Sequence, residues 1–136
     1  MNVQDTFMMI KPDAVERGSE CVASILYRIE KDVGIIKRLI RQQVSVVCAF
    51  ELYAEHKGRP FYDSLIDFTS DGECILMRVI GEDAIDKART LVGATNPANA
   101  DPNTLRRIWG TIGPRNAVHA SDSLDSADRE LRIMGM

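Results

Sequence analysis

Strand-like and helix-like segments alternate along the whole chain, and their order is the feature that most restricts its fold. Four strand-like runs lie at residues 6–10, 35–47, 74–80 and 116–119. Segments with helical apolar spacing or helix-start signals lie at 21–33, 48–56, from 60 onward, 82–91 and 124–133. Mixed segments joined by short connections predict an α+β sandwich, with helices packed on one or both faces of a sheet.

The length and composition predict one domain over residues 1–136. Hydrophobic residues make up 45% of the 136 residues, and no linker, repeat or low-complexity tract divides them. The three cysteines are scattered and show no CxxC spacing, so we expect reduced thiols. The chain start lacks a secretory signal, and no apolar run approaches the roughly 20 residues that span a bilayer. These features predict a cytoplasmic protein.

Charge and motif content argue against several classes of function. The net charge of −3 and the sequence pI of about 5.4 disfavour nucleic acid as the main ligand and binding to an anionic membrane. With only His56 and His119 available, a zinc site is not expected. The glycine-rich phosphate loops, the GxSxG elbow and the protein-kinase catalytic loop are all missing. A phosphate-handling protein of this sequence would work without them.

The segment 94–115 is predicted to be a long functional loop, because it holds three of the five prolines and no clear period. Residues 89–115 contain four arginines, no lysine and one acid, a local charge of +3 (four minus one). Arginine presents a planar set of donors that matches phosphate oxygens. The residues alone leave two interpretations open, a polyanion pocket or a solvated loop.

Two further residues are candidates for phosphate chemistry. His119 lies where a strand ends and a helix begins, and a neutral imidazole there could attack phosphorus; a packed histidine is the alternative. Lys11 follows the first strand, where its ammonium could hold a phosphate or simply be solvated. His56, flanked by Glu55 and Lys57, is interpreted as a surface residue.

Four blocks of sequence resemble the nucleoside diphosphate kinase family. Residues 116–123 (Asn-Ala-Val-His-Ala-Ser-Asp-Ser) are similar to its signature Asn-x-x-His-x-Ser-Asp, and residues 10–14, 53–61 and 93–97 match further family blocks. The likeness runs in order from about residue 5 to 131. It implies a ferredoxin-like βαββαβ fold, with a four-stranded antiparallel sheet and helices across one face.

The resemblance also implies a reaction. The γ-phosphate of a donor such as ATP would pass to His119, and a second nucleoside diphosphate would take it from the histidine in a ping-pong cycle. Mg²⁺ would arrive on the nucleotide phosphates, with no protein metal cage. By similarity, Lys11, Arg106 and Asn116 would contact phosphates or sugar, Arg89 and Thr95 the distal phosphates, and Phe61 the base. Tyr53 would pack beside the site, and Ser121 and Glu130 would position the histidine.

The sequence departs from the family pattern at two places. Residues 18–23 carry about two extra residues before the first helix, and 107–109 replace a segment that is usually small, then acidic or polar, then aromatic. A homo-oligomer is expected from the resemblance. The alternative is a non-catalytic nucleotide-binding relative that acts as a scaffold, and the intact His119, Lys11, Asn116 and Glu130 argue against it.

Overall fold

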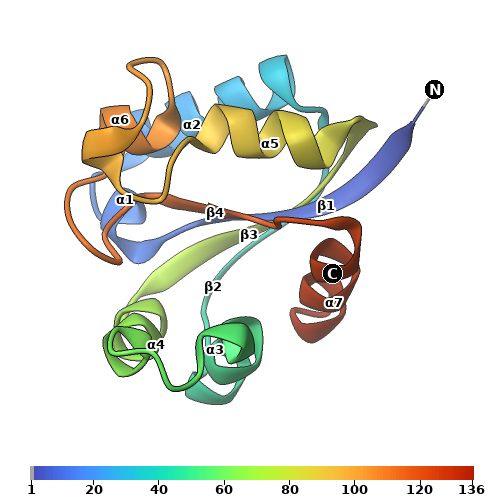
Figure 1. Cartoon of the computed structure of the whole chain (residues 1–136). Coiled ribbons are helices and arrows are strands. Elements are labelled where there is room, and N and C mark those ends of the chain that lie inside the picture. Colours follow the sequence, from blue (N-terminus) through green and yellow to red (C-terminus); the bar gives the residue numbers. More distant parts are fainter. Residues whose placement is uncertain (1) are drawn as a thin grey trace.

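Four antiparallel strands form one sheet in the order β2-β3-β1-β4 in the computed structural model, which describes residues 2–136 (Figure 1). The strands are β1 (Val3–Ile10), β2 (Ile35–Gln43), β3 (Glu73–Glu82) and β4 (Val118–Ala120). The central strand β1 pairs with β3 along its whole length and with β4 over three residues. The predicted four-stranded antiparallel sheet is confirmed.

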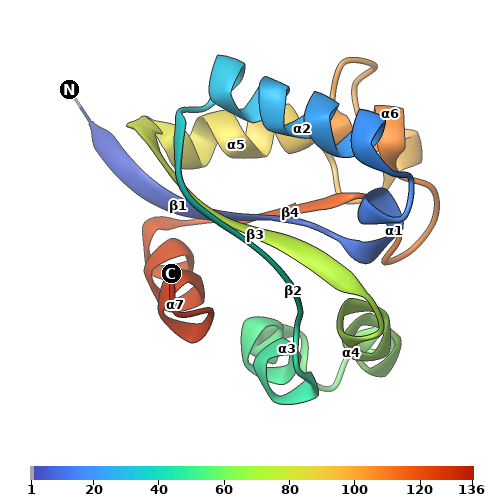
Figure 2. The ribbon, with the colours of Figure 1, turned by 180° about the vertical axis from the view of Figure 1, so that it is seen from behind.

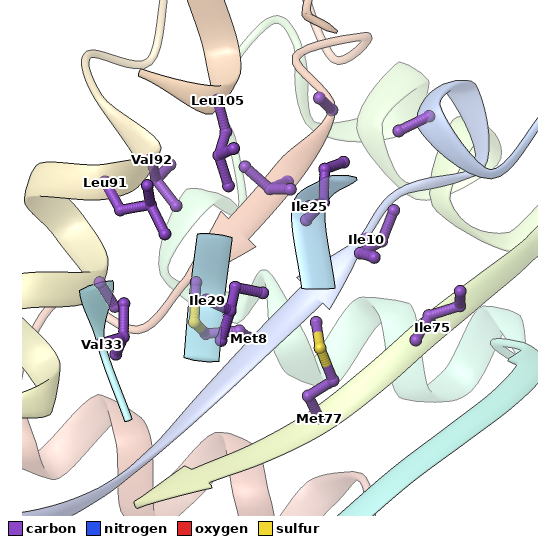
Figure 3. Packing of buried hydrophobic residues seen from close by; sticks show 14 of the residues in the cluster. Met8, Ile10, Ile25, Ile29, Val33, Ile75, Met77, Leu91, Val92 and Leu105 are labelled. Atoms are coloured by element: carbon purple, nitrogen blue, oxygen red, sulfur yellow. The ribbon is translucent and has the colours of Figure 1, made fainter. Parts of the chain in front are cut away.

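One face of the sheet is covered by α2 (Ser19–Asp32) and α5 (Ala84–Val92), with α1 (Pro12–Val15) and α6 (Leu105–Trp109) at one end (Figure 1). Met8 and Ile10 of β1 point into the core on this side, against Ile25 and Ile29 of α2 (Figure 3). The apolar stripe predicted for the first helix is therefore the surface that α2 buries.

Helices also cover the opposite face, so the expectation of helices across one face is incomplete. The helices there are α3 (Val46–Leu52), α4 (Tyr62–Ser70) and α7 (Leu124–Ile133) (Figures 1 and 2). Phe7 and Met9 alternate with Met8 and Ile10 along β1 and enter a second core on this side. All four side chains are fully buried. An unbroken apolar run in a strand requires cover on both faces of the sheet.

The predicted boundary between the second strand and the next helix is wrong by a few residues. The strand ends at Gln43 rather than 47, because Ser45 accepts a hydrogen bond from the backbone N–H of Cys48 at 3.1 Å and caps α3. The β-branched Val46 and Val47 extended the strand-like pattern into the helix. The helix expected over 48–56 is instead α3 followed by a short 3₁₀ turn, η1 (Ala54–His56).

The segment 94–115 is not one structureless loop. It contains a 3₁₀ turn, η2 (Pro97–Asn99), and the helix α6, which takes in two departures from the family pattern, Arg107 and Ile108. The side chain of Thr104 caps α6 by accepting the N–H of Arg107 at 3.3 Å. Gly93 holds φ at +88°, and a Cβ there would lie 2.6 Å from that of Thr104, so no other residue fits this junction.

The extra residues near 18–23 are absorbed at the start of α2. Gly18 adopts φ of +97° immediately before the helix, which begins at Ser19, two residues earlier than predicted. The last helix, α7, spans the predicted residues 124–133. No helix within residues 2–136 is both long and apolar enough to cross a membrane.

Candidate active site

His119 lies on the short edge strand β4, opposite Met9 of β1, and α7 brings Glu130 back against it. Its ring Nε2 is 2.7 Å from Oε1 of Glu130, whose residue is only 2% exposed. The hydroxyl of Ser121 donates to the same carboxylate oxygen, also at 2.7 Å. Two donors therefore fix one carboxylate oxygen, and that oxygen fixes the imidazole.

This arrangement selects the chemistry of the imidazole. An ionised carboxylate can only accept, so Nε2 carries the hydrogen and the neutral ring keeps its lone pair on Nδ1. Nδ1 has no hydrogen-bond partner within residues 2–136. The Phe7 ring and the edge-on Tyr53 ring flank the imidazole, with centroids at 5.7 and 5.8 Å. His119 is thus a half-buried, oriented imidazole rather than a packed core histidine, and such an imidazole is chemically able to act as a nucleophile.

Lys11 is buried at the end of β1, so the solvated alternative for this residue is wrong. It is 4% exposed, and its Nζ donates to Oδ1 of Asn116 at 2.9 Å and to the carbonyl of Pro114 at 3.3 Å. Burial, and after it the charge of Arg106, lower the pKa of Lys11 to about 8. A buried ammonium without a paired carboxylate is a strong attractor for an anion.

Arg106 comes to the same region from α6. Its guanidinium donates to the carbonyls of Gly93 at 3.1 Å and Val118 at 3.0 Å, and the second of these belongs to the strand that carries His119. Its buried Nε has no partner within residues 2–136. Burial lowers the pKa of Arg106 to about 10, so the group stays charged at neutral pH. The buried Lys11 and the half-buried Arg106 therefore place two cations in this region, and neither makes an ion pair closer than 4 Å within residues 2–136.

The four arginines of the 89–115 segment do not form one pocket. Arg107 donates to the carbonyls of Ala98 and Ala100, at 3.4 and 3.2 Å, and so holds the loop together. Arg115 lies over the ring of Phe68, 5.0 Å from its centroid. Arg89 is exposed on α5. Of the four, Arg106 bonds to the strand of His119 and the charge of Arg89 acts on it, whereas Arg107 and Arg115 are engaged in other contacts.

The side chain of Asn116 is hydrogen-bonded to the backbone of Thr95. Nδ2 of Asn116 donates to the carbonyl of Thr95 at 2.9 Å, while its Oδ1 accepts from Lys11. Asn116 is buried and Thr95 is exposed. The amide of Asn116 therefore ties the loop after α5 to the lysine.

Aromatic rings form a row that leads outward from His119. The Tyr53 ring stacks with His56 at 6.2 Å between centroids, and His56 meets Phe61 edge-on at 5.4 Å. Burial raises the pKa of the Tyr53 hydroxyl. Phe61 is 46% exposed and offers an open ring face. His56 is a half-buried surface residue whose ring takes part in this row.

Asp13 is a residue of this region that the sequence analysis did not single out. Its Oδ2 accepts the backbone N–H of Ala117 at 3.0 Å, within the segment that leads to His119. A carboxylate in a turn gives no distinctive pattern in the sequence.

A groove of about 780 Å³ lies elsewhere, between β1, β3 and α7, and none of the predicted site residues lines it.

The fold and this site define a class: a ferredoxin-like protein in which a buried glutamate orients a strand histidine, with a buried lysine and a half-buried arginine in the same region. The comparisons with known proteins agree with that class. The model of the nucleoside diphosphate kinase family matches residues 4–134. The chain belongs to the nucleoside diphosphate kinase family.

The relatives match over nearly the whole chain. A nucleoside diphosphate kinase of Archaeoglobus fulgidus is 42% identical over 131 residues, 96% of this chain and 85% of its own. One from Staphylococcus aureus is 41% identical over 132 residues, again 96% of this chain and 87% of its own. A solved structure of the Aquifex aeolicus nucleoside diphosphate kinase superposes with a TM-score of 0.91 at 36% identity, covering 97% of this chain and 94% of that one. The ferredoxin-like fold is thereby confirmed.

Proposed function

We propose that the protein is an active nucleoside diphosphate kinase that carries the phosphoryl group on Nδ1 of His119. One observation supports this most strongly. Nε2 of His119 is hydrogen-bonded to Glu130, which leaves the lone pair of Nδ1 available in a region of positive charge. A scaffold that only bound nucleotide would have no use for a histidine oriented in this way.

The proposed reaction has two half-reactions. The lone pair of Nδ1 attacks the γ-phosphorus of a nucleoside triphosphate, an N–P bond forms, and the bond from phosphorus to the β,γ-bridging oxygen breaks. The diphosphate leaves with that electron pair. A terminal phosphate oxygen of a second nucleoside diphosphate then attacks the same phosphorus, and the N–P bond breaks to restore neutral His119. No external water or redox partner is needed.

The surrounding residues have separate roles in this proposal. Lys11 and Arg106 offset the negative charge of the phosphates, and Asn116 holds Lys11 while it binds phosphate or sugar. Arg89 and Thr95 reach the distal phosphates from the exposed side. Glu130 and Ser121 keep the imidazole turned and in one tautomer. Tyr53 packs against the imidazole and limits its rotation.

We treat Mg²⁺ as part of the nucleotide substrate. Within residues 2–136 no group of three or more histidine, cysteine or acidic side chains is placed to hold a metal ion. The carboxylate bonded to His119 already accepts two hydrogen bonds. When bound, the ion would supply charge neutralisation between the phosphates.

Phe61 is the proposed contact for the base. Its open ring face can stack on any purine or pyrimidine, because every base has a π-face. Stacking of this kind carries no hydrogen-bond code, so we expect broad tolerance for the base.

Assembly and location are also proposed. The outer side of β2 forms an edge of the sheet, and Ile35 and Leu39 are exposed on it. An open edge with apolar side chains favours pairing with another copy, so we propose a homo-oligomer.

The free thiols of Cys21, Cys48 and Cys74 support a reducing, cytoplasmic location. The family match over 4–134 supports a single domain.

The test is a pulse of the purified protein with γ-labelled ATP and Mg²⁺, followed by a chase with unlabelled GDP. We expect label on the protein that is stable in alkali, lost in acid and discharged as GTP. His119→Ala should take up no label while it still binds ADP. A folded wild-type protein that binds ATP but takes up no label would favour the non-catalytic scaffold instead.

A further inference from the structure

A buried hydrogen-bonded clamp joins the turn after β1 to the segment that leads into β4. Oδ2 of Asp13 accepts the backbone N–H of Ala117 at 3.0 Å. The carbonyl of Ala117 in turn accepts the backbone N–H of Lys11 at 2.8 Å. Both polar groups of one peptide residue are thus held by a stretch of chain more than 100 residues away in sequence.

Ala117 needs such a clamp because its backbone is strained. Its φ is +73°, in the left-handed region, and its side chain is fully buried. Residues with a Cβ rarely adopt this conformation, and they hold it only when their surroundings impose it. The two hydrogen bonds of the clamp act on this conformation, together with the turn bond from the N–H of Val118 to the carbonyl of Asn116 at 2.9 Å.

The strained residue lies between two residues of the proposed site. Asn116 precedes it and binds the ammonium of Lys11 at 2.9 Å, while His119 follows two residues later. The left-handed step at Ala117 therefore sets the direction of Asn116 relative to the strand of His119. A relaxed Ala117 would change both the lysine contact and the direction in which β4 begins.

Asp13 is more than a convenient acceptor in the turn. Burial raises the pKa of its carboxyl, and its second oxygen, Oδ1, is buried without a hydrogen-bond partner within residues 2–136. An unpartnered buried oxygen of this kind carries a desolvation cost. Its position calls for a role that an apolar side chain could not fill.

We propose that Asp13 is a positioning residue for phosphoryl transfer, which holds Ala117 in its left-handed conformation and so sets Asn116 and His119 relative to Lys11. The proposal rests on the proposed function. Asp13 acts through the backbone and does not touch the reacting atoms. Its loss should slow transfer to His119 more than it weakens nucleotide binding.

The charge of Asp13 gives a second, separable effect. Lys11 is faced by Asp13 from α1, Arg106 from α6, Cys74 from β3 and the ring of Tyr53. Of these, the Asp13 carboxylate favours its protonated form, while the charge of Arg106 opposes it. An uncharged acceptor at position 13 would therefore keep the clamp but let Lys11 lose its proton at lower pH.

The experiment compares Asp13→Ala, Asp13→Ala/Ala117→Gly and Asp13→Asn, with Glu16→Gln as the matched control. Glu16 is an exposed acid at the end of the same short helix, α1. The measurements are the single-turnover rate of phosphohistidine formation from MgATP, the Kd for ADP and the Tm. Circular dichroism at the assay temperature checks that each variant is folded.

We expect Asp13→Ala to lose at least about tenfold in the phosphorylation rate, because small displacements of reacting groups have effects of this size. The Kd for ADP should change by less than about threefold. Adding Ala117→Gly should restore most of the rate, since glycine adopts positive φ without a steric penalty. Asp13→Asn should keep the phosphorylation rate at pH 7. As the pH is raised, its rate should begin to fall at a lower pH than that of the wild type. Glu16→Gln should match the wild type.

Two results would overturn the proposal. One is a folded Asp13→Ala protein with a lower Tm but a phosphorylation rate within twofold of the wild type, which would make Asp13 a structural residue only. The other is a double variant that regains stability without regaining rate. If Asp13→Ala does not fold, the folded double variant decides: a phosphorylation rate more than about tenfold below that of the wild type overturns the proposal, because glycine needs no clamp to hold a positive φ. An alkaline limb of Asp13→Asn identical to that of the wild type overturns the charge effect alone. Absence of phosphohistidine in the wild type would instead contradict the proposed function.

Discussion

The burial of Lys11 predicts that nucleotide binding weakens as the pH rises through about 8. Its pKa is lowered to about 8, first by desolvation and then by the charge of Arg106. About a tenth of the lysine is then deprotonated at pH 7 and about nine tenths at pH 9. If only the ammonium form binds the phosphates, the apparent Kd for ADP rises about tenfold over this interval. Arg106, with a pKa of about 10, stays largely charged over the same interval.

The assay is a calorimetric titration of ADP into the protein at pH 7, 8 and 9, at fixed ionic strength and Mg²⁺ concentration. Lys11→Arg keeps its charge over this range, so its weaker binding should not change with pH. Lys11→Met should bind weakly at every pH. A wild-type Kd that is constant from pH 7 to 9 would refute the argument. So would an equal decline in Lys11→Met, which would place the titration on another group.

Two further predictions concern the orientation of His119 and the contact with the base. Ser121→Ala removes a buried hydrogen bond to the Glu130 carboxylate and should cost about 2 kcal/mol of unfolding free energy, measured by urea denaturation, with a slower phosphorylation of His119. An unchanged rate would show that Glu130 holds the imidazole without the serine. Phe61→Ala should raise the KM of purine and pyrimidine substrates alike in a coupled assay, by about 5- to 150-fold for a loss of about 1–3 kcal/mol of stacking. A loss limited to purines would contradict indiscriminate stacking.

Much of the fold follows from local patterns in the sequence. The runs that became β1 and β3 are short and strongly apolar, and β1 pairs with β3 along its whole length. The extent of α7 was predicted to the residue, because Ser123 gives a clear start to the helix by capping the N–H of Ser126 at 3.1 Å. The cover on both faces could also be inferred from residues 7–10, which are apolar without alternation.

The element boundaries that were predicted wrongly depend on contacts between distant parts of the chain. Residues 94–115 lack an apolar period because α6 buries a single residue, Leu105, and owes its start to the cap at Thr104. A five-residue helix of this kind has little amphipathic signal. Its formation depends on packing beside Gly93, which lies eleven residues before Thr104 in the chain.

For the candidate site, the sequence predicted which residues belong to it, but not how they are arranged in space. The motif around His119 and the resemblance pointed to Lys11, Asn116 and Arg106 together. Which of the four arginines turns inward depends on the carbonyls that each one meets, as the bonds of Arg107 to the loop backbone illustrate. The clamp between Asp13 and Ala117 has no local signature at all, because it depends on a backbone angle and on a contact across the fold.

The burial that lowers the pKa of Lys11 also destabilises the folded protein at neutral pH. Because its pKa is about 8 when folded and near 10.5 when unfolded, the unfolded chain binds more protons between these values. The contribution of Lys11 to the unfolding free energy therefore rises with pH over that window, by about 3 kcal/mol in full, and is lowest below pH 8. That is the range in which the ammonium can bind phosphate. A bound nucleotide adds negative charge beside Lys11, so binding energy offsets a cost that the fold carries at neutral pH.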